Sequence, residues 1–339
     1  MTDPTPTPGI HHVTCIASDP QQNLDFWVET LGLRLVKRSI NQDDPGTYHF
    51  FFADAEGTPG TSMTFFPWRG LPRGQPGAGQ VARTSFRIPE ESLNYWEERF
   101  EEYGVEYDER FKRTIEDDGD RHSETVLPFR DPDGLPLELV AVPISDDDPT
   151  VPWTAFVPED AAIRGFHSVT LALSDPDPTA GLLETMGFDE LGTVRATGGD
   201  PGDERRRFAA SGPVGRYVDI VQTTDRGRQG HGTVHHVAFQ TPTDDDQLAM
   251  QSAIQTAGLN PTRQIDRHWF RSVYVREFGG VLFELATSDP GYTSDEPLDS
   301  LGERLVLPGA FEQRRDEIAS QLADVTVPRP ESAPGDVQR

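Results

Sequence analysis

Residues 9–36 have the sequence GIHHVTCIASDPQQNLDFWVETLGLRLV, and this stretch sets the pattern for most of the chain. A short strand-like run at 11–14 is followed by a helical stretch at 23–31 and then by Gly32. Glycine directly after a helical stretch is typical of a helix C-cap, because glycine adopts the left-handed backbone conformation without strain. The stretch therefore predicts a strand, a helix and a sharp turn into the next strand.

The same order recurs three more times along the chain. First strands are expected at 11–14, 83–86, 166–169 and 235–238. Helices are expected at 23–31, 90–103, 179–186 and 245–257, ending at Gly32, Gly104, Gly187 and Gly258. The interval from His12, Thr84 or His167 to the following glycine is 20 residues in each case, and from His236 it is 22 residues. Matching intervals of this length indicate a repeated supersecondary unit.

Three strands rich in Val, Phe, Leu and Tyr complete each unit, so each unit is predicted to be a βαβββ module. The last strands are expected at 61–68, 136–142, 216–222 and 281–286. One such module leaves a sheet face uncovered, so two modules must pair and enclose a cup. We expect an α+β fold of four βαβββ modules paired into two open-barrel, or cup, domains. The chain divides into residues 9–144, residues 164–288, and a C-terminal extension at 289–339 with one helix at 309–323 and a disordered tail.

The composition excludes several classes of protein. The chain of 339 residues carries a formal net charge of −27, which argues against binding to nucleic acid or to anionic membranes. No run approaches the ~20 apolar residues of a membrane-spanning helix. Cys15 is the single cysteine, so an internal disulfide framework and a cysteine-based zinc site are excluded. No secretory signal pattern is present at the start, and a cytoplasmic location is expected.

The basic residues are almost all arginine, because lysine occurs only at Lys37 and Lys112. The acidic residues are spread along the chain and are not gathered in one tail. A surface of this kind repels itself at low salt and requires screening to stay compact. We therefore expect an intracellular protein of an extreme halophile, which loses structure on dialysis to low salt.

Matching positions on the first and fourth strands of the modules contain a set of metal-ligand residue types. They are His12 and Thr64, Thr84 and Glu138, His167 and Asp219, and His236 and Glu284. A cup made from modules one and four would bring together His12, His236 and Glu284. Two neutral imidazoles and one carboxylate, with other coordination positions open, suit Fe(II) that binds substrate and oxygen together. Thr64 leaves the fourth position without the second carboxylate that a metal-dependent isomerase would require.

Two further residues raise the question of a second site. Glu284 lies in an apolar strand, where an unpaired carboxylate is costly, and this favours a cation beside it. Glu138 is flanked by leucines in the same way, and with His167 it would form either a second metal site or a vestigial, hydrogen-bonded pair. Thr84 completes such a site poorly, which favours the vestigial pair.

The chain resembles the vicinal oxygen chelate (glyoxalase/bleomycin resistance/extradiol dioxygenase) superfamily, and within it the hydroquinone ring-cleaving dioxygenases of the 2,6-dichlorohydroquinone type. The resemblance extends from about residue 9 to the last helix. Its most specific pieces are the sequences at 11–14, 51–54, 57–60, 165–168, 235–236, 274–276 and 279–284. The resemblance implies Fe(II), with Mn(II) as the alternative ion, on His12, His236 and Glu284. It leaves His167 without a ligand role, whereas catechol extradiol enzymes pair modules three and four.

The same resemblance implies that His11, His235, Tyr274 and Arg267 are catalytic and that Thr14 lies at the substrate. His11 and His235 are the expected acid–base groups, since imidazole titrates near neutrality. Strict strand alternation would turn one histidine of each pair out of the cup unless the strand is irregular there. His268 stands where the family commonly has a small residue and would narrow the pocket, and Phe270 is expected as an apolar wall or as part of the core.

The expected activity is oxygenative ring cleavage of a hydroquinone-type aromatic diol, with both atoms of O2 entering the product. The expected partners are this small aromatic diol and O2, with no nucleic acid or membrane, and a homo-oligomer is left open. Three alternatives remain at this point. They are a catechol extradiol dioxygenase, a glyoxalase-type isomerase or thiol transferase, and a non-enzymatic protein that binds an aromatic ligand.

Overall fold

A computed structural model describes residues 4–117, 120–197 and 204–330 of the chain. The four predicted βαβββ modules are confirmed, each with its strand, helix and three further strands in the predicted order. The four glycines expected to end the helices all have positive φ, at 71° for Gly32, 66° for Gly104, 93° for Gly187 and 101° for Gly258. A side chain at these positions would be strained, so the glycine spacing in the sequence reports real helix ends.

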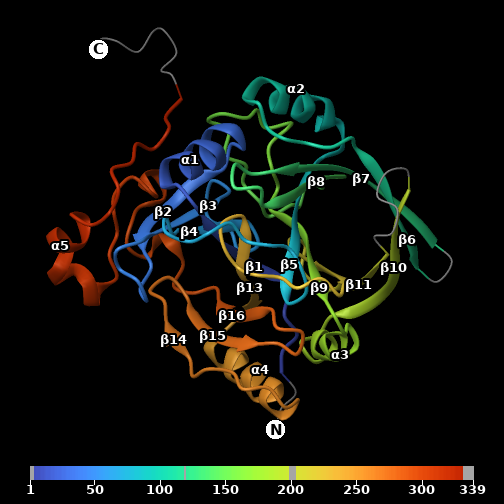
Figure 1. Ribbon diagram of the computed structural model, residues 1–339. Helices are drawn as coiled ribbons and strands as arrows, with labels where there is room; N and C mark the ends of the chain where they lie inside the picture. Colours follow the sequence, from blue (N-terminus) through green and yellow to red (C-terminus); the bar gives the residue numbers. More distant parts are fainter. Residues whose placement is uncertain (1–3, 118–119, 198–203, 331–339) are drawn as a thin grey trace.

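Modules one and four share one curled sheet of eight strands in the order β14-β15-β16-β13-β1-β4-β3-β2, which we call the cup (Figure 1). The antiparallel contact between β1 and β13 joins the two modules. The strands of module one are β1 (Ile10–Ala17), β2 (Arg34–Ile40), β3 (Tyr48–Ala53) and β4 (Ser62–Pro67). The strands of module four are β13 (Thr233–Thr241), β14 (Ile265–Asp266), β15 (Arg271–Arg276) and β16 (Leu282–Thr287).

Modules two and three form a second sheet in the order β10-β11-β12-β9-β5-β8-β7-β6, and this sheet closes into a barrel because β10 pairs with β6. The strands of module two are β5 (Gln80–Pro89), β6 (Phe111–Asp117), β7 (Asp120–Arg130) and β8 (Pro136–Val142). The strands of module three are β9 (Phe166–Leu173), β10 (Asp189–Thr197), β11 (Arg205–Ala209) and β12 (Tyr217–Gln222). The two expected cup-like domains are therefore confirmed: one sheet is the open, curled cup and the other closes into a barrel.

The spatial division of the molecule differs from the division along the chain. Residues 9–144 supply β1–β4 to the cup and β5–β8 to the barrel, and residues 164–288 supply β9–β12 to the barrel and β13–β16 to the cup. Neither half of the chain builds a cup by itself. The pairing of module one with module four is the one that the ligand set required.

Helices cover the outer faces of the two sheets. The helix of module one is α1 (Pro20–Leu24), which continues as a π-helix over Asp25–Thr30; the others are α2 (Leu93–Tyr103), α3 (Asp177–Thr185) and α4 (Asp244–Thr256). Helices α1 and α2 lie side by side at one end of the molecule, and α3 and α4 at the other (Figure 1). The apolar core lies between helices and sheets, where the fully buried Trp27 packs against Phe52, Phe65 and Phe86. The insides of the cup and barrel are left for polar groups.

The C-terminal extension runs along module one, beside β2 (Figure 1). The helix predicted at 309–323 is shorter than expected, with a 3₁₀ segment at Gly309–Arg314 followed by α5 (Arg315–Ala319). The end of the predicted disordered tail, 331–339, lies outside the described residues. Within the described ranges, no helix has the length and apolar character needed to cross a membrane.

Candidate metal centre

Three side chains from three neighbouring strands of the cup converge on one point. They are His12 on β1, His236 on β13 and Glu284 on β16, all buried. The two Nε2 atoms are 3.3 Å apart, and Glu284 Oε2 is 3.4 Å from Nε2 of His12 and 2.9 Å from Nε2 of His236. Among the residues that the structure describes, this is the single cluster of three or more candidate ligands. It is the set predicted from the sequence.

The spacing of these atoms fits a divalent transition metal. Ligand atoms bonded at about 2.1 Å to one ion with right angles between the bonds are about 3.0 Å apart. Glu284 Oε1 accepts a hydrogen bond from Ser272 at 2.5 Å, but buried Oε2 has no hydrogen-bond donor in the described chain. Burial opposes the charge on Glu284, yet the two imidazoles outweigh it and hold the pKa of the carboxyl well below its usual range. A charged, buried oxygen beside two imidazole nitrogens is the arrangement that a cation would complete.

A second histidine supports each histidine ligand. His11 Nδ1 is 2.9 Å from His12 Nδ1, and His235 Nδ1 is 2.8 Å from His236 Nδ1. Burial lowers the pKa of both His11 and His235 to about 3, so both rings are neutral near neutral pH. When the ligand ring donates its Nδ1–H to its neighbour, its Nε2 lone pair is directed at the metal position. Partners of this kind fix the ring orientation of metal ligands.

Both supporting histidines lie at irregularities in their strands. The register between β1 and β13 shifts at Ile10/His12 and again at Thr14/Cys15. The first shift makes His11 the extra residue on β1, and the second makes His235 the extra residue on β13. A β-bulge breaks the strict alternation of side chains, so adjacent residues can approach each other. The irregularity explains how two neighbouring histidines on each strand meet at one centre.

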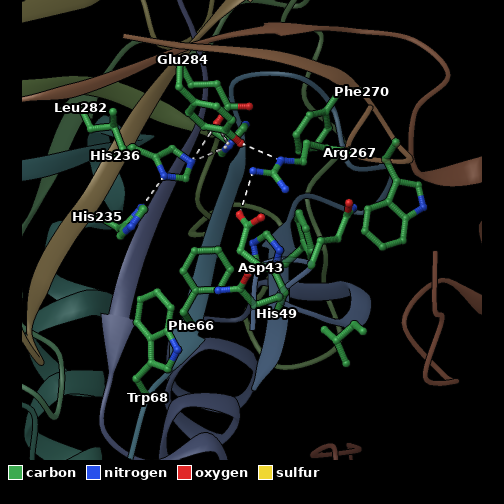
Figure 2. A pocket seen from close by; sticks show the side chains of 17 residues that line it. Asp43, His49, Phe66, Trp68, His235, His236, Arg267, Phe270, Leu282 and Glu284 are labelled. Carbon is green, nitrogen blue, oxygen red and sulfur yellow. Dashed lines mark hydrogen bonds and ion pairs between the residues drawn. The ribbon is translucent and has the colours of Figure 1, made fainter. Parts of the chain in front are cut away.

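The three candidate ligands line a cavity of about 270 Å³. Figure 2 shows His236 and Glu284 beside each other in its wall. Aromatic rings form much of its wall, and they come from Phe51, Phe66, Trp68, Trp269 and Phe270. Phe270 lies against the candidate ligand His12, with ring centroids 5.0 Å apart. The cavity is therefore shaped to take a flat, apolar ring with polar groups directed at the metal position.

Arg267 and Tyr274 bring polar groups to this cavity. Arg267 Nε donates to the Tyr274 hydroxyl at 3.2 Å, and its guanidinium also pairs with Asp43 at 2.9 Å (Figure 2). Burial and nearby Glu284 raise the pKa of Tyr274, although Arg267 opposes them. Tyr274 therefore keeps its proton and has it available for donation. Burial opposes the charge on Arg267, but Tyr274 and Asp43 raise its pKa, so the cation is retained.

The predicted catalytic and substrate residues separate into two groups. His235, Arg267, Tyr274 and Phe270 line the cavity that contains the ligands. His11 faces a different cavity, which shares the walls Trp269 and Phe270 with the first. Thr14 is buried and bonds to Thr64 at 2.7 Å, and His268 is turned toward Asp295; neither lines the metal cavity. The side chain of His268 therefore does not narrow the pocket, contrary to expectation.

Sequence reasoning missed His49, which lies on β3 and lines the cavity. Its Nε2 is 3.0 Å from Thr64 Oγ1, and burial lowers its pKa well below the usual value. Alternation along β3 gave a usable signal, because His49 and Phe51 share one face of the strand and both reach the cavity. Trp68 and Asp43 carried no such signal, since both lie outside the described strands.

Thr64 occupies the position that would hold a fourth protein ligand. It pairs with Thr14 on the adjacent parallel strand, and its hydroxyl contacts both Thr14 and His49. The hydroxyl is thus held by neighbouring side chains, and the neighbouring residues Met63 and Phe65 are apolar and fully buried. No second carboxylate reaches the ligand cluster from any described residue.

The equivalent place in the barrel contains ion pairs. Glu138 accepts two hydrogen bonds of 2.8 Å from Arg113 and one of 2.7 Å from Ser85. His167 Nε2 is 3.1 Å from Glu124, and Arg207 pairs with Asp219 through two hydrogen bonds. The predicted Glu138–His167 pair is therefore wrong, because each residue has another partner. Arginine side chains fill the space that a second metal would need.

Because of these ion pairs, we expect the free energy of unfolding to decrease as the pH falls into the acid range. Burial opposes the charge on Glu138, but Arg113, Arg205 and Arg83 outweigh it and hold its pKa well below the usual range of a glutamate. A carboxyl whose pKa is lower in the folded state stabilises the fold above the unfolded pKa and loses that contribution as pH falls. The difference in unfolding free energy between the wild type and Glu138→Gln should be largest near neutral pH and shrink below about pH 4.5. Urea titrations at several pH values would measure this difference. A difference that does not change with pH would show that the charge of Glu138 does not stabilise the fold.

Comparison with known proteins agrees with this architecture. Residues 9–139 and 150–285 each match the Glyoxalase/Bleomycin resistance protein/Dioxygenase superfamily. The chain is 42% identical over 319 residues to a Bacillus subtilis protein named "Putative ring-cleaving dioxygenase MhqO", covering 93% of this chain and 96% of that protein. It is 31% identical over 337 residues to the chlorohydroquinone/hydroquinone 1,2-dioxygenase of Sphingobium indicum, covering 96% of this chain and 99% of that enzyme.

Solved structures show the same likeness. A crystal structure of a "putative dioxygenase" from Bacillus subtilis superposes with a TM-score of 0.84 at 41% identity, covering 96% of this chain and 99% of that one. Glyoxalase I from Zea mays superposes with a TM-score of 0.56 at 14% identity, covering 83% of this chain and 92% of that one, which shows a shared fold alone. With its two family matches, its four modules and its His-His-Glu cluster, the chain belongs to the glyoxalase/bleomycin resistance protein/dioxygenase superfamily.

Proposed function

We propose that the protein is an Fe(II)-dependent ring-cleaving dioxygenase that acts on hydroquinone-type aromatic diols and inserts both atoms of O2 on ring opening. The superfamily contains isomerases as well as oxygenases, so the fold alone does not select the reaction. The names of the relatives support a ring-cleaving dioxygenase, and one of them is named for chlorohydroquinone and hydroquinone.

The observation that carries the proposal is the three-residue ligand set with Thr64 at the fourth position. Two histidines and one carboxylate with open positions are typical of Fe(II) oxygenases. A glyoxalase-type isomerase needs a further carboxylate as ligand and proton shuttle, and Thr64, Met63 and Phe65 supply none. When bound, Fe(II) would lower the pKa of a substrate hydroxyl and allow electron transfer from the ring to oxygen.

The side chains of the cavity would hold the diol in place. Trp68 and Phe66 on one wall and Phe270 on the other present apolar surfaces to a flat ring. Tyr274 accepts from Arg267 and can donate its own proton to a substrate oxygen. The positive charge of Arg267 lies beside it and would stabilise negative charge that develops on that oxygen. These two residues would therefore orient the diol as well as favour its anion.

His235 is the better placed of the two candidate acid–base histidines. It lines the cavity at the edge of Phe66 and Trp68, with ring centroids 5.6 Å and 5.9 Å away. Its Nδ1 accepts from His236, so its neutral ring carries the proton on Nε2 and can donate it to a substrate oxygen. His11 faces the other cavity, and its role in this proposal is to hold the ring of His12 in its orientation.

An oxygen electrode would test the proposal. Protein in high salt, chosen because of the net charge of −27, would be loaded anaerobically with Fe(II) and given hydroquinone, methylhydroquinone, chlorohydroquinone or catechol. We expect one O2 consumed per diol, with turnover of about 1 per second or faster for a hydroquinone. Isotopically labelled O2 should place both atoms in the ring-opened product.

Each competing function predicts a different result in the same assay. Uptake with catechol and none with hydroquinones would indicate a catechol extradiol dioxygenase. No uptake despite stoichiometric iron, with conversion of a hemithioacetal instead, would indicate a glyoxalase-type isomerase. Tight binding of a diol by metal-free protein without turnover would indicate a binding protein. Any of these three results would overturn the proposal.

A further inference from the structure

A buried lysine joins the C-terminal extension to the cup. Lys37 lies on β2 and is fully buried. It is one of only two lysines in the chain. Its ammonium donates to Asp295 and, at 2.6 Å, to Glu296, and both acids belong to the extension. A buried ammonium is costly unless it is paired. The extension therefore supplies the charges that β2 requires, and we call these three residues the Lys37 cluster.

Asp295 also holds a loop beside the metal cavity. Its Oδ1 accepts from Lys37, and its Oδ2 accepts from His268 Nε2 at 2.8 Å and from Trp269 Nε1 at 2.9 Å. Lys37 Nζ also lies 5.5 Å from the centroid of the Trp269 ring. One carboxylate thus ties β2, the extension and the loop together. Glu296 contacts Lys37 and the extension but makes no described contact with the loop.

The loop is the pair His268–Trp269 at the middle of the four-residue connection, 267–270, between β14 and β15. Asp266 pairs with Arg271, and Arg267 N–H donates to the Phe270 carbonyl at 2.9 Å, which closes the hairpin. His268 has a φ of 81°, the single positive value among the described residues other than glycine. A positive φ within a hairpin loop favours glycine at that position. The backbone of His268 is held by Asp266 and its side chain by Asp295.

Three residues of this hairpin, Arg267, Trp269 and Phe270, line the metal cavity, whereas Asp295 does not. We propose that Asp295 is a positioning residue for diol binding, which holds the His268–Trp269 loop so that Arg267 and Trp269 keep their places in the cavity wall. The proposal rests on the proposed function for its substrate. Through Asp295, the C-terminal extension would therefore affect the affinity for the substrate. It would do so by holding a loop in which His268 has an unfavourable positive φ.

The test compares Asp295→Asn with the matched variant Glu296→Gln. Asparagine has the shape of aspartate, but its single amide oxygen cannot accept both from Lys37 and from the two loop donors, and its NH2 group faces donors on the other side. Displacing a binding group by about 1 Å costs up to about a hundredfold, so we expect KM for the diol to rise about tenfold or more in Asp295→Asn. The kcat at saturating diol should fall by a smaller factor than kcat/KM, because the candidate ligands His12, His236 and Glu284 are untouched. Glu296→Gln should lower thermal stability and leave KM within about twofold of the wild type, since Glu296 does not touch the loop.

Hydrogen exchange followed by mass spectrometry gives a second readout that needs no substrate. Asp295→Asn should speed exchange in residues 265–272, and Glu296→Gln should speed it only near residues 296–303. Faster exchange at 265–272 with no oxygen uptake by the wild type would support the positioning role and overturn the proposed reaction. Equal KM values in the two variants, or unchanged exchange at 265–272 in Asp295→Asn, would overturn the positioning role while leaving the proposed reaction standing.

Discussion

Replacing Glu284 by glutamine is expected to remove metal binding and to reduce ring cleavage by at least about 10³-fold. Its carboxylate supplies the one negatively charged ligand of the cluster. The amide of glutamine is neutral and would bind a metal ion more weakly. His12→Ala and His236→Ala should have effects of the same order, because each removes one of the three ligand atoms. Iron content after anaerobic loading and oxygen uptake with a hydroquinone would both be measured for each variant.

His167→Ala is the matched control for these substitutions. The interval to the following glycine matches His167 with His12 in the sequence, but the Nε2 of His167 pairs with Glu124 in the barrel. We expect this variant to bind iron stoichiometrically and to retain most of the activity. Loss of iron in His167→Ala with retention in His12→Ala would place the metal in the barrel and would refute the assigned centre.

The second large effect is expected on stability, from Asp219→Asn in the barrel. Asp219 is fully buried and holds the fully buried Arg207 through hydrogen bonds of 2.7 and 2.9 Å. Breaking a buried pair by removing one charge leaves the other uncompensated, which costs about 3–5 kcal/mol. Arg207 would keep its 2.6 Å contact with Glu124, so we expect a loss of about 3 kcal/mol. Urea unfolding would measure the loss.

The neighbouring residue on the same strand provides the control. Arg206 on β11 points outward and pairs with Glu190, and both side chains are 33% exposed. Exposed ion pairs contribute up to about 1 kcal/mol, so Glu190→Gln should change the unfolding free energy far less than Asp219→Asn. Iron content and activity of the folded protein should be unchanged in both. Similar small losses in the two variants would show that water or rearrangement compensates Arg207 inside the barrel.

Two levels of the structure were accessible from the sequence, and for different reasons. The modules followed from local chemistry, since Gly32, Gly104, Gly187 and Gly258 mark helix ends that only glycine fits easily. The ligand set followed from chemical cost, because a carboxylate in the apolar strand around Glu284 requires a cation or a buried partner. The family resemblance added the roles of Arg267 and Tyr274, and both residues lie in the cavity.

Other features had no local signal. Arg205, Arg206 and Arg207 follow one another on β11, so their side chains point alternately to its two faces. The sequence does not tell which of the two faces is enclosed. Arg205 and Arg207 are buried inside the closed barrel, where a sequence pattern would place apolar residues. The adjacent histidine pairs were similarly ambiguous, because their meeting depends on bulges in the contact between β1 and β13.

By itself, the sequence determined four βαβββ modules and the three side chains able to hold a metal. Only the tertiary structure decided which modules share a sheet, that one sheet closes, and that Asp295 reaches Lys37 and Trp269. The first set depends on backbone preferences and burial costs that act within a few residues. The second depends on hydrogen bonds and ion pairs between residues that are from 26 to more than 200 positions apart, and no short-range pattern encodes them.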